Sequence, residues 1–210
     1  MKKLLALSAL AFAVPAQSAI LVSYVGGPSG PTAGTTIFQD FNSLVPGASI
    51  GTNAFAYNTS TSNGAIPAFN STGNYGAVLS NGSYNVTFAT AASIFSFVLG
   101  SVDTYNRLTL TMSSGGPIVY DGSAINNGPV ADGNQVGSGT NGRVTYTVTG
   151  GGPFILGAAF ESIGANSFEF DDLAIQAVPE PSTWLMMLMG FAAVGFGMRR
   201  RNAQATPAVA

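Results

Sequence analysis

Four carboxylates near the end of the chain are the residues whose type and spacing come closest to a chemical site: Glu161, Glu169, Asp171 and Asp172. Two carboxyl groups that flank a glycosidic bond can cleave it, one acting as general acid and the other as base or nucleophile. Such a pair would make the protein a glycoside hydrolase.

The same acids also suit a hard cation, because Ca²⁺ takes several oxygen ligands from carboxylates and backbone carbonyls. The calcium hypothesis assigns Asp171, Asp172 and Glu161 as ligands of a structural ion, and no other cofactor is expected. A third interpretation places solvated acids at strand ends. In Phe168-Glu169-Phe170-Asp171 the alternation directs both phenylalanines inward and both acids outward to water.

Two glycine-rich motifs match catalytic or cofactor patterns without their required context. Gly47-Ala48-Ser49-Ile50-Gly51 has the G-x-S-x-G spacing of a nucleophile elbow, but the chain contains no histidine to take the serine proton. The G-x-G-x-x-G at 137–142 is followed by an alternating strand pattern, whereas a dinucleotide site needs a helix to begin there. Both motifs are interpreted as loops.

Charge is sparse and unevenly placed. Between Ala19 and Ala177 eight acidic residues stand against two arginines, which leaves a net charge of −6. This region has no basic patch to neutralise phosphates, so nucleic-acid binding is not expected. The chain has no cysteine, which excludes disulfides and thiolate metal sites. Recurring Phe, Val, Ile and Leu still allow a buried core.

Residues 19–177 are expected to form an all-β domain. Polar and apolar residues alternate clearly at Tyr84–Phe88, Leu108–Met112 and Val144–Thr149. Continuously apolar runs indicate central strands at Ile94–Leu99 and Phe154–Phe160. Weaker strand patterns occur at Ile20–Val25, Thr36–Phe41, Ala54–Tyr57, Tyr75–Leu79, Ile118–Tyr120, Ser167–Phe170 and Leu173–Ala177.

Turn residues separate these strands, and no sustained helical stripe occurs within 19–177. Asn81-Gly82, between two strand patterns, predicts a tight hairpin. Many short strands with closely spaced turns favour a β-sandwich of jelly-roll type.

Both ends of the chain differ from this domain. Residues 1–18 have the features of a secretory signal peptide: Lys2 and Lys3, an apolar stretch, and small residues before a cleavage point after Ser18. Near the C-terminus, a charge-free run from Trp184 to Met198 is followed by Arg199, Arg200 and Arg201. This predicts a single transmembrane helix with the arginines in the cytoplasm.

The C-terminal segment 178–201 also carries a specific resemblance. Val178-Pro179-Glu180-Pro181-Ser182-Thr183-Trp184, Met186-Met187, Gly190-Phe191 and Arg199-Arg200-Arg201 resemble the PEP-CTERM sorting domain in its W-A-M-M-x-x-G-F variant, with Leu185 in place of Ala. Residues 202–210 form a tail longer than is typical of that domain.

The resemblance implies a Gram-negative host and an inner-membrane exosortase that recognises Pro179, Glu180 and Pro181 after the secretion machinery has exported the chain. It implies a transient membrane anchor during processing, followed by release to the cell surface or outside the cell.

The sequence therefore favours a non-catalytic exported surface or extracellular-matrix protein that binds polysaccharide, with a polysaccharide hydrolase as the alternative. A further alternative is an ice- or surface-binding protein, because Thr145, Thr147 and Thr149 share one predicted strand face and Thr109 and Thr111 another.

Overall fold

The computed structural model describes residues 19–128, 130–179 and 181–203. The predicted signal peptide, residues 1–18, and residues 204–210 of the predicted tail lie outside the described residues. The chain forms two units, one ending at Ala177 and the other beginning at Val178.

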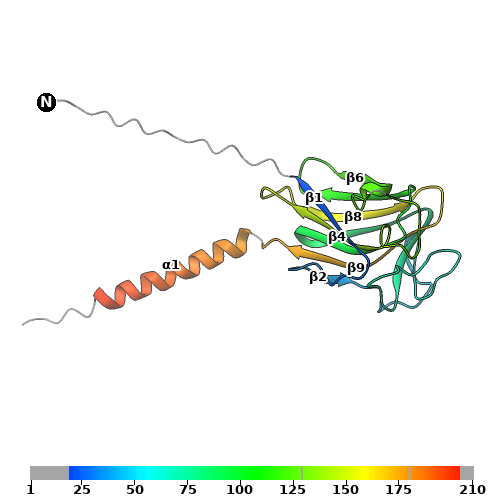
Figure 1. Ribbon diagram of the computed structural model, residues 1–210. Helices are drawn as coiled ribbons and strands as arrows, with labels where there is room; N and C mark the ends of the chain where they lie inside the picture. The colour runs from blue at the N-terminus through cyan, green and yellow to red at the C-terminus, as the bar shows by residue number, and fades with distance from the viewer. Residues whose placement is uncertain (1–18, 129, 180, 204–210) are drawn as a thin grey trace, which may run out of the picture. The chain divides into compact units, whose positions relative to one another are not determined.

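The first unit is an antiparallel β structure, which confirms the all-β class (Figure 1). Its nine strands lie in one curled sheet, where the sequence had predicted a sandwich of jelly-roll type. The strands are β1 (Ile20–Gly26), β2 (Thr36–Gln39), β3 (Ser49–Tyr57), β4 (Tyr75–Gly100), β5 (Asn106–Met112), β6 (Ile118–Asp121), β7 (Gly142–Val148), β8 (Ile155–Ser162) and β9 (Phe168–Ala177). A short 3₁₀ helix, Gly122–Ala124, follows β6.

Strand β4 organises the sheet, since it pairs with β3, β7, β8 and β9. It also overturns the predicted hairpin at Asn81-Gly82. The strand continues through this point, and β3 pairs with it on both sides of a register shift. Asn81 adopts a positive φ of 57°. A Cβ on Gly82 would lie 2.5 Å from the Asn53 carbonyl oxygen, so the dipeptide forms a bulge pressed against β3 rather than a turn.

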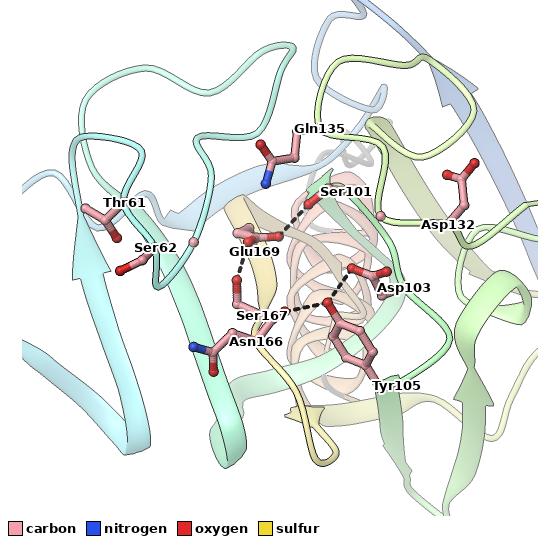
Figure 2. A pocket seen from close by; sticks show the side chains of 12 residues that line it. Thr61, Ser62, Ser101, Asp103, Tyr105, Asp132, Gln135, Asn166, Ser167 and Glu169 are labelled. Atoms are coloured by element: carbon pink, nitrogen blue, oxygen red, sulfur yellow. Dashed lines mark hydrogen bonds between the residues drawn. The ribbon is translucent and has the colours of Figure 1, made fainter.

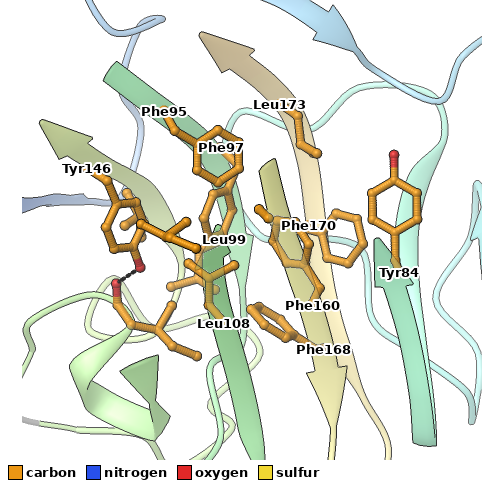
Figure 3. Close-up of a cluster of buried hydrophobic side chains, with 14 of the residues drawn as sticks. Tyr84, Phe95, Phe97, Leu99, Leu108, Tyr146, Phe160, Phe168, Phe170 and Leu173 are labelled. Carbon is orange, nitrogen blue, oxygen red and sulfur yellow. Dashed lines mark hydrogen bonds between the residues drawn. The ribbon is translucent and has the colours of Figure 1, made fainter. Parts of the chain in front are cut away.

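The core is rich in aromatic side chains, which pack together with aliphatic ones from several strands (Figure 3). Phe160 on β8 is fully buried, with its ring stacked on Phe170 of β9 at a centroid distance of 4.1 Å. The ring of Phe97 contacts the Phe160 ring edge-on, with 5.1 Å between the two centroids. The hydroxyl of buried Tyr146 donates a hydrogen bond to the carbonyl oxygen of Ile125, so its polar end is satisfied.

The opposite face of β9 is also covered, by the connection between β3 and β4 (residues 58–74). Its Ala65 backbone N–H contacts Glu169, and its Ser71 hydroxyl contacts Asp171. Glu169 is 2% exposed and Asp171 is 1% exposed. The expectation that these acids face water is therefore wrong, although the alternation did place them opposite Phe168 and Phe170.

The second unit contains helix α1 (Pro181–Ala203). Proline suits this first helical position, where its missing N–H leaves no hydrogen bond unmade. Among the described residues, no helix combines the length and the apolar character that a membrane crossing needs, so the predicted transmembrane helix is not supported. The charge-free run from Trp184 to Met198 is shorter than the about 20 apolar residues of a typical span.

Candidate functional site

A polar pocket of about 210 Å³ lies beside the start of β9 and the end of β4 (Figure 2). We call it the polar pocket. Hydroxyl, amide and carboxylate groups dominate its lining: Thr61, Ser62, Gly64, Ser101, Asp103, Tyr105, Asp132, Gly133, Gln135, Asn166, Ser167 and Glu169. These residues come from four separate parts of the chain, which the sheet register brings together.

Glu169 forms the floor of the polar pocket. Its carboxylate accepts hydrogen bonds from the Ser167 hydroxyl, from the Ser101 hydroxyl at 2.9 Å and from the Ala65 backbone N–H at 3.1 Å. Burial raises the pKa of Glu169 above its usual range, while these three donors act in the opposite direction. A carboxylate held by three donors is a fixed acceptor, which orients the surrounding hydroxyls.

Asp103 and Tyr105 form one wall. The Tyr105 hydroxyl lies 2.6 Å from Asp103 Oδ2 and 2.5 Å from the Asn166 carbonyl oxygen. A hydroxyl has one proton, so it donates to one of these oxygens at a time. Burial raises the pKa of Asp103, and the nearby Asp132 carboxylate raises it further, while the Tyr105 hydrogen bond lowers it.

The rim of the polar pocket carries exposed, uncharged polar side chains. Figure 2 shows Thr61 and Ser62 on the side opposite Asp103 and Tyr105, with Gln135 above Ser101 and Glu169. Exposed amides and hydroxyls over a buried, oriented floor are the groups that bind sugar hydroxyls, since each can donate and accept.

The structure gives each of the three predicted calcium ligands a different protein partner. Asp171 accepts from Ser71 at 2.6 Å, and Asp172 faces Arg143 with 3.4 Å between Oδ2 and Nη2. Glu161 lies on β8, where it pairs in register with Arg107 of β5. The described part of the chain contains no group of three or more acidic, histidine or cysteine side chains placed to hold a metal ion.

Of the four acids that the sequence singled out, Glu169 alone lines the polar pocket. Sequence reasoning missed Ser101. It considered Asp103 as a further calcium ligand and Tyr105 as one of several tyrosines that could stack on sugars, but it did not join either residue to Glu169. Their link to Glu169 is the pairing of Gly100 with Glu169 across β4 and β9, which spans a long sequence separation. The available signal was the presence of Asp103 and Tyr105 in the short segment that follows the apolar run Ile94–Leu99.

The threonine faces do not form one array. Thr145 and Thr147 lie on β7 and Thr109 and Thr111 on β5, two strands that do not pair with each other. Thr145 is buried, and its hydroxyl lies 2.8 Å from the Thr32 hydroxyl.

All the residues of the predicted sorting motif belong to the second unit. Pro179 precedes α1 and Pro181 begins it, while Glu180 lies outside the described residues. Trp184, Arg199, Arg200 and Arg201 lie within the helix. Large apolar side chains along α1 are exposed, among them Leu185, Phe191 and Phe196.

Comparison with known proteins gives a match to this segment. The family model described as the PEP-CTERM protein-sorting motif matches residues 177–201. Neither the curated proteins nor the solved structures include a match to the chain. The order of Pro-Glu-Pro, helix and arginine cluster agrees with this match. The chain therefore carries a PEP-CTERM sorting motif, which implies an exosortase substrate that is exported, processed at the membrane and then extracellular.

Proposed function

We propose that this protein is a non-catalytic surface or matrix protein of a Gram-negative bacterium, and that its β unit binds extracellular polysaccharide at the polar pocket. The sorting motif at 177–201 supports delivery to the polymer-rich cell exterior. The observation that carries polysaccharide binding is the polar pocket itself, with exposed hydroxyl and amide groups over the fixed acceptor Glu169.

Binding by the polar pocket is tested with two substitutions. Gln135→Ala removes an exposed amide at the rim, and Tyr105→Phe removes one wall hydroxyl. Each should weaken binding to the host's extracellular polysaccharide about five- to tenfold, because a lost hydrogen bond contributes about 1 kcal/mol. The measurement is affinity electrophoresis or calorimetry with the purified polymer.

Asn85→Ala is the matched control, since Asn85 is an exposed amide of β4 that does not line the polar pocket. Equal affinity of the wild type, Gln135→Ala and Tyr105→Phe would reject the polar pocket as the site. Failure of the wild type to bind any fraction of the host polysaccharide would reject polysaccharide binding as a whole.

A hydrolase is the second candidate, because Glu169 and Asp103 line one pocket and burial raises the pKa of both. Its test is release of reducing ends from polysaccharide by the wild type, compared with Asp103→Asn and Glu169→Gln. Turnover that both substitutions abolish would replace the non-catalytic proposal.

The proposed processing also makes a testable prediction. The C-terminal segment would engage the inner membrane only until the exosortase cuts near Pro179-Glu180-Pro181, so the mature protein should lack Trp184–Ala210. Intact-mass measurement of the surface-associated form checks this. Replacement of all three motif residues by alanine should leave the uncut chain in the membrane fraction. A surface form that retains the tail would contradict the prediction.

A further inference from the structure

A second site stands out because it contains a buried cation with free donors. Arg143 on β7 is 3% exposed. It lies in register between Val25 of β1 and Val98 of β4, two apolar neighbours that offer no acceptor. Its side chain is on the face opposite the core residues Val144 and Tyr146, under the connection between β1 and β2.

The guanidinium has few partners for so buried a group. Among the described residues its one ion pair is with Asp172, at 3.4 Å between Nη2 and Oδ2. Nε and Nη1 are buried and make no hydrogen bond within the part of the chain that the structure describes. The buried hydroxyl of Ser96, which pairs with Thr145 two residues along the same strands, likewise has no partner there. Unmade hydrogen bonds of a buried charge are costly, so these donors indicate a missing acceptor.

A pocket of about 430 Å³ borders Arg143. We call it the Arg143 pocket. Hydroxyl groups and the β1–β2 connection form its lining with the arginine: Ser23, Val25, Ser29, Gly30, Pro31, Thr32, Arg143, Thr145 and Thr147. The contact between the Thr32 and Thr145 hydroxyls, at 2.8 Å, holds the connection against β7.

We propose that the Arg143 pocket binds the carboxylate of an acidic sugar, a uronic acid of an extracellular polysaccharide. The guanidinium would receive the carboxylate, for which its planar donor set is suited. The surrounding serine and threonine hydroxyls would exchange hydrogen bonds with the hydroxyls of the sugar ring. The sugar part of this inference rests on the proposed polysaccharide binding, and the charge part rests on Arg143 alone.

Charge favours a carboxylate over a phosphate. Asp172 already offsets part of the arginine charge, Asp171 also acts on it, and residues 19–177 as a whole carry eight acids against two bases. A singly charged carboxylate meets less repulsion there than a doubly charged phosphate or a dense polyanion such as nucleic acid. The Arg143 pocket would thus select carboxylated glycans over neutral glycans and over glycans that carry phosphomonoesters.

The test is calorimetric titration of the purified full chain with short oligomers of galacturonate, alginate and hyaluronan, and with their methyl esters. At least one acidic oligomer should bind. Its methyl ester should bind about ten- to hundredfold more weakly, because a charge-assisted hydrogen bond contributes about 1.5–3 kcal/mol. Arg143→Met should cause a similar loss, with an apolar chain of similar length in the buried position.

Two further variants separate binding from folding. Val25→Trp starts from a side chain that is 55% exposed and lines the Arg143 pocket, so it should block binding while the buried network stays intact. Arg107→Met is the matched control and should bind as the wild type does, since Arg107 lies on β5 in an exposed ion pair with Asp121.

Three outcomes would overturn the inference. The acid and its methyl ester could bind equally, Val25→Trp could bind as the wild type does, or inorganic phosphate or sulfate could compete as well as the acidic oligomer. Binding of neutral polysaccharide that Gln135→Ala weakens and Arg143→Met leaves unchanged would also overturn it, while the polar pocket proposal would stand. If the acidic oligomers bind and neutral polymers do not, the Arg143 pocket is supported and the polar pocket loses its role.

Discussion

Phe160→Ala should lower the free energy of unfolding of the β unit by about 3–5 kcal/mol, the range for truncating a buried phenylalanine. Phe160 is fully buried at the centre of the aromatic cluster. Its ring lies within 4.1 Å of Phe170, 5.1 Å of Phe97 and 5.3 Å of Phe168, measured between centroids. Truncation removes the free energy gained by transferring the phenyl ring from water to the core, and it leaves a cavity lined by rigid rings.

Urea denaturation followed by tyrosine fluorescence measures this loss. Phe160→Leu should cost less than the alanine variant, because it leaves a smaller cavity. Val119→Ala is the surface control, since Val119 on β6 is 51% exposed, and it should change stability by less than about 0.5 kcal/mol. A loss below about 1 kcal/mol for Phe160→Ala would show that the cluster does not carry the stability of the unit.

The β unit should become less stable as the pH rises from about 4 to about 7, and Asp171 should account for a large part of this change. Burial raises the pKa of Asp171 from 3.8 to about 7, against the lowering effects of the Ser71 hydroxyl and the Asp172 backbone N–H. Because the folded state holds the proton more tightly than the unfolded state, the stability contribution is complete below the unfolded pKa. It is lost as the pH rises through the folded pKa.

Asp171→Asn isolates this contribution. The amide keeps a carbonyl oxygen as an acceptor and does not ionise. Between about pH 5 and 6 the slope of unfolding free energy against pH should become less negative by about 1.4 kcal/mol per pH unit, which corresponds to one proton. Burial also raises the pKa of Glu169 and of Asp172, so part of the slope should remain.

Denaturation curves across this pH range provide the measurement. Asn85→Ala, which alters an exposed side chain of β4 that does not ionise, is the control and should leave the slope unchanged. Stability of the wild type that rises toward neutral pH, or an unaltered slope in Asp171→Asn, would contradict the prediction.

The strand prediction succeeded where side-chain alternation reports directly on the core. Along Leu108–Met112 and Val144–Val148 the apolar positions predicted to share a face, such as Leu108, Leu110, Val144 and Tyr146, are buried in the cluster. At Asn81-Gly82 the local turn signal was outweighed, because β3 pairs with β4 on both sides of the dipeptide and turns it into a bulge. Turn propensity is a local preference that long-range pairing can override.

The four carboxylates show most clearly what a sequence pattern cannot predict about the environment of a side chain. The alternation of Phe168, Glu169, Phe170 and Asp171 determined by itself which side chains face the core and which face away. What covers the far side is a contact between β9 and residues 58–74, made by groups such as Ala65 and Ser71 about a hundred positions away. This covering turns two expected surface acids into buried, hydrogen-bonded groups with raised pKa values.

The sequence alone determined the all-β class and the sorting motif, because both depend on neighbouring residues: strand alternation in one case, a contiguous Pro-Glu-Pro, apolar and arginine order in the other. The tertiary structure alone decided the two candidate sites. It pairs Gly100 with Glu169 to form the polar pocket, and it buries Arg143 between Val25 and Val98. Burial and desolvation of these groups depend on residues distant in the chain, and no local pattern encodes them.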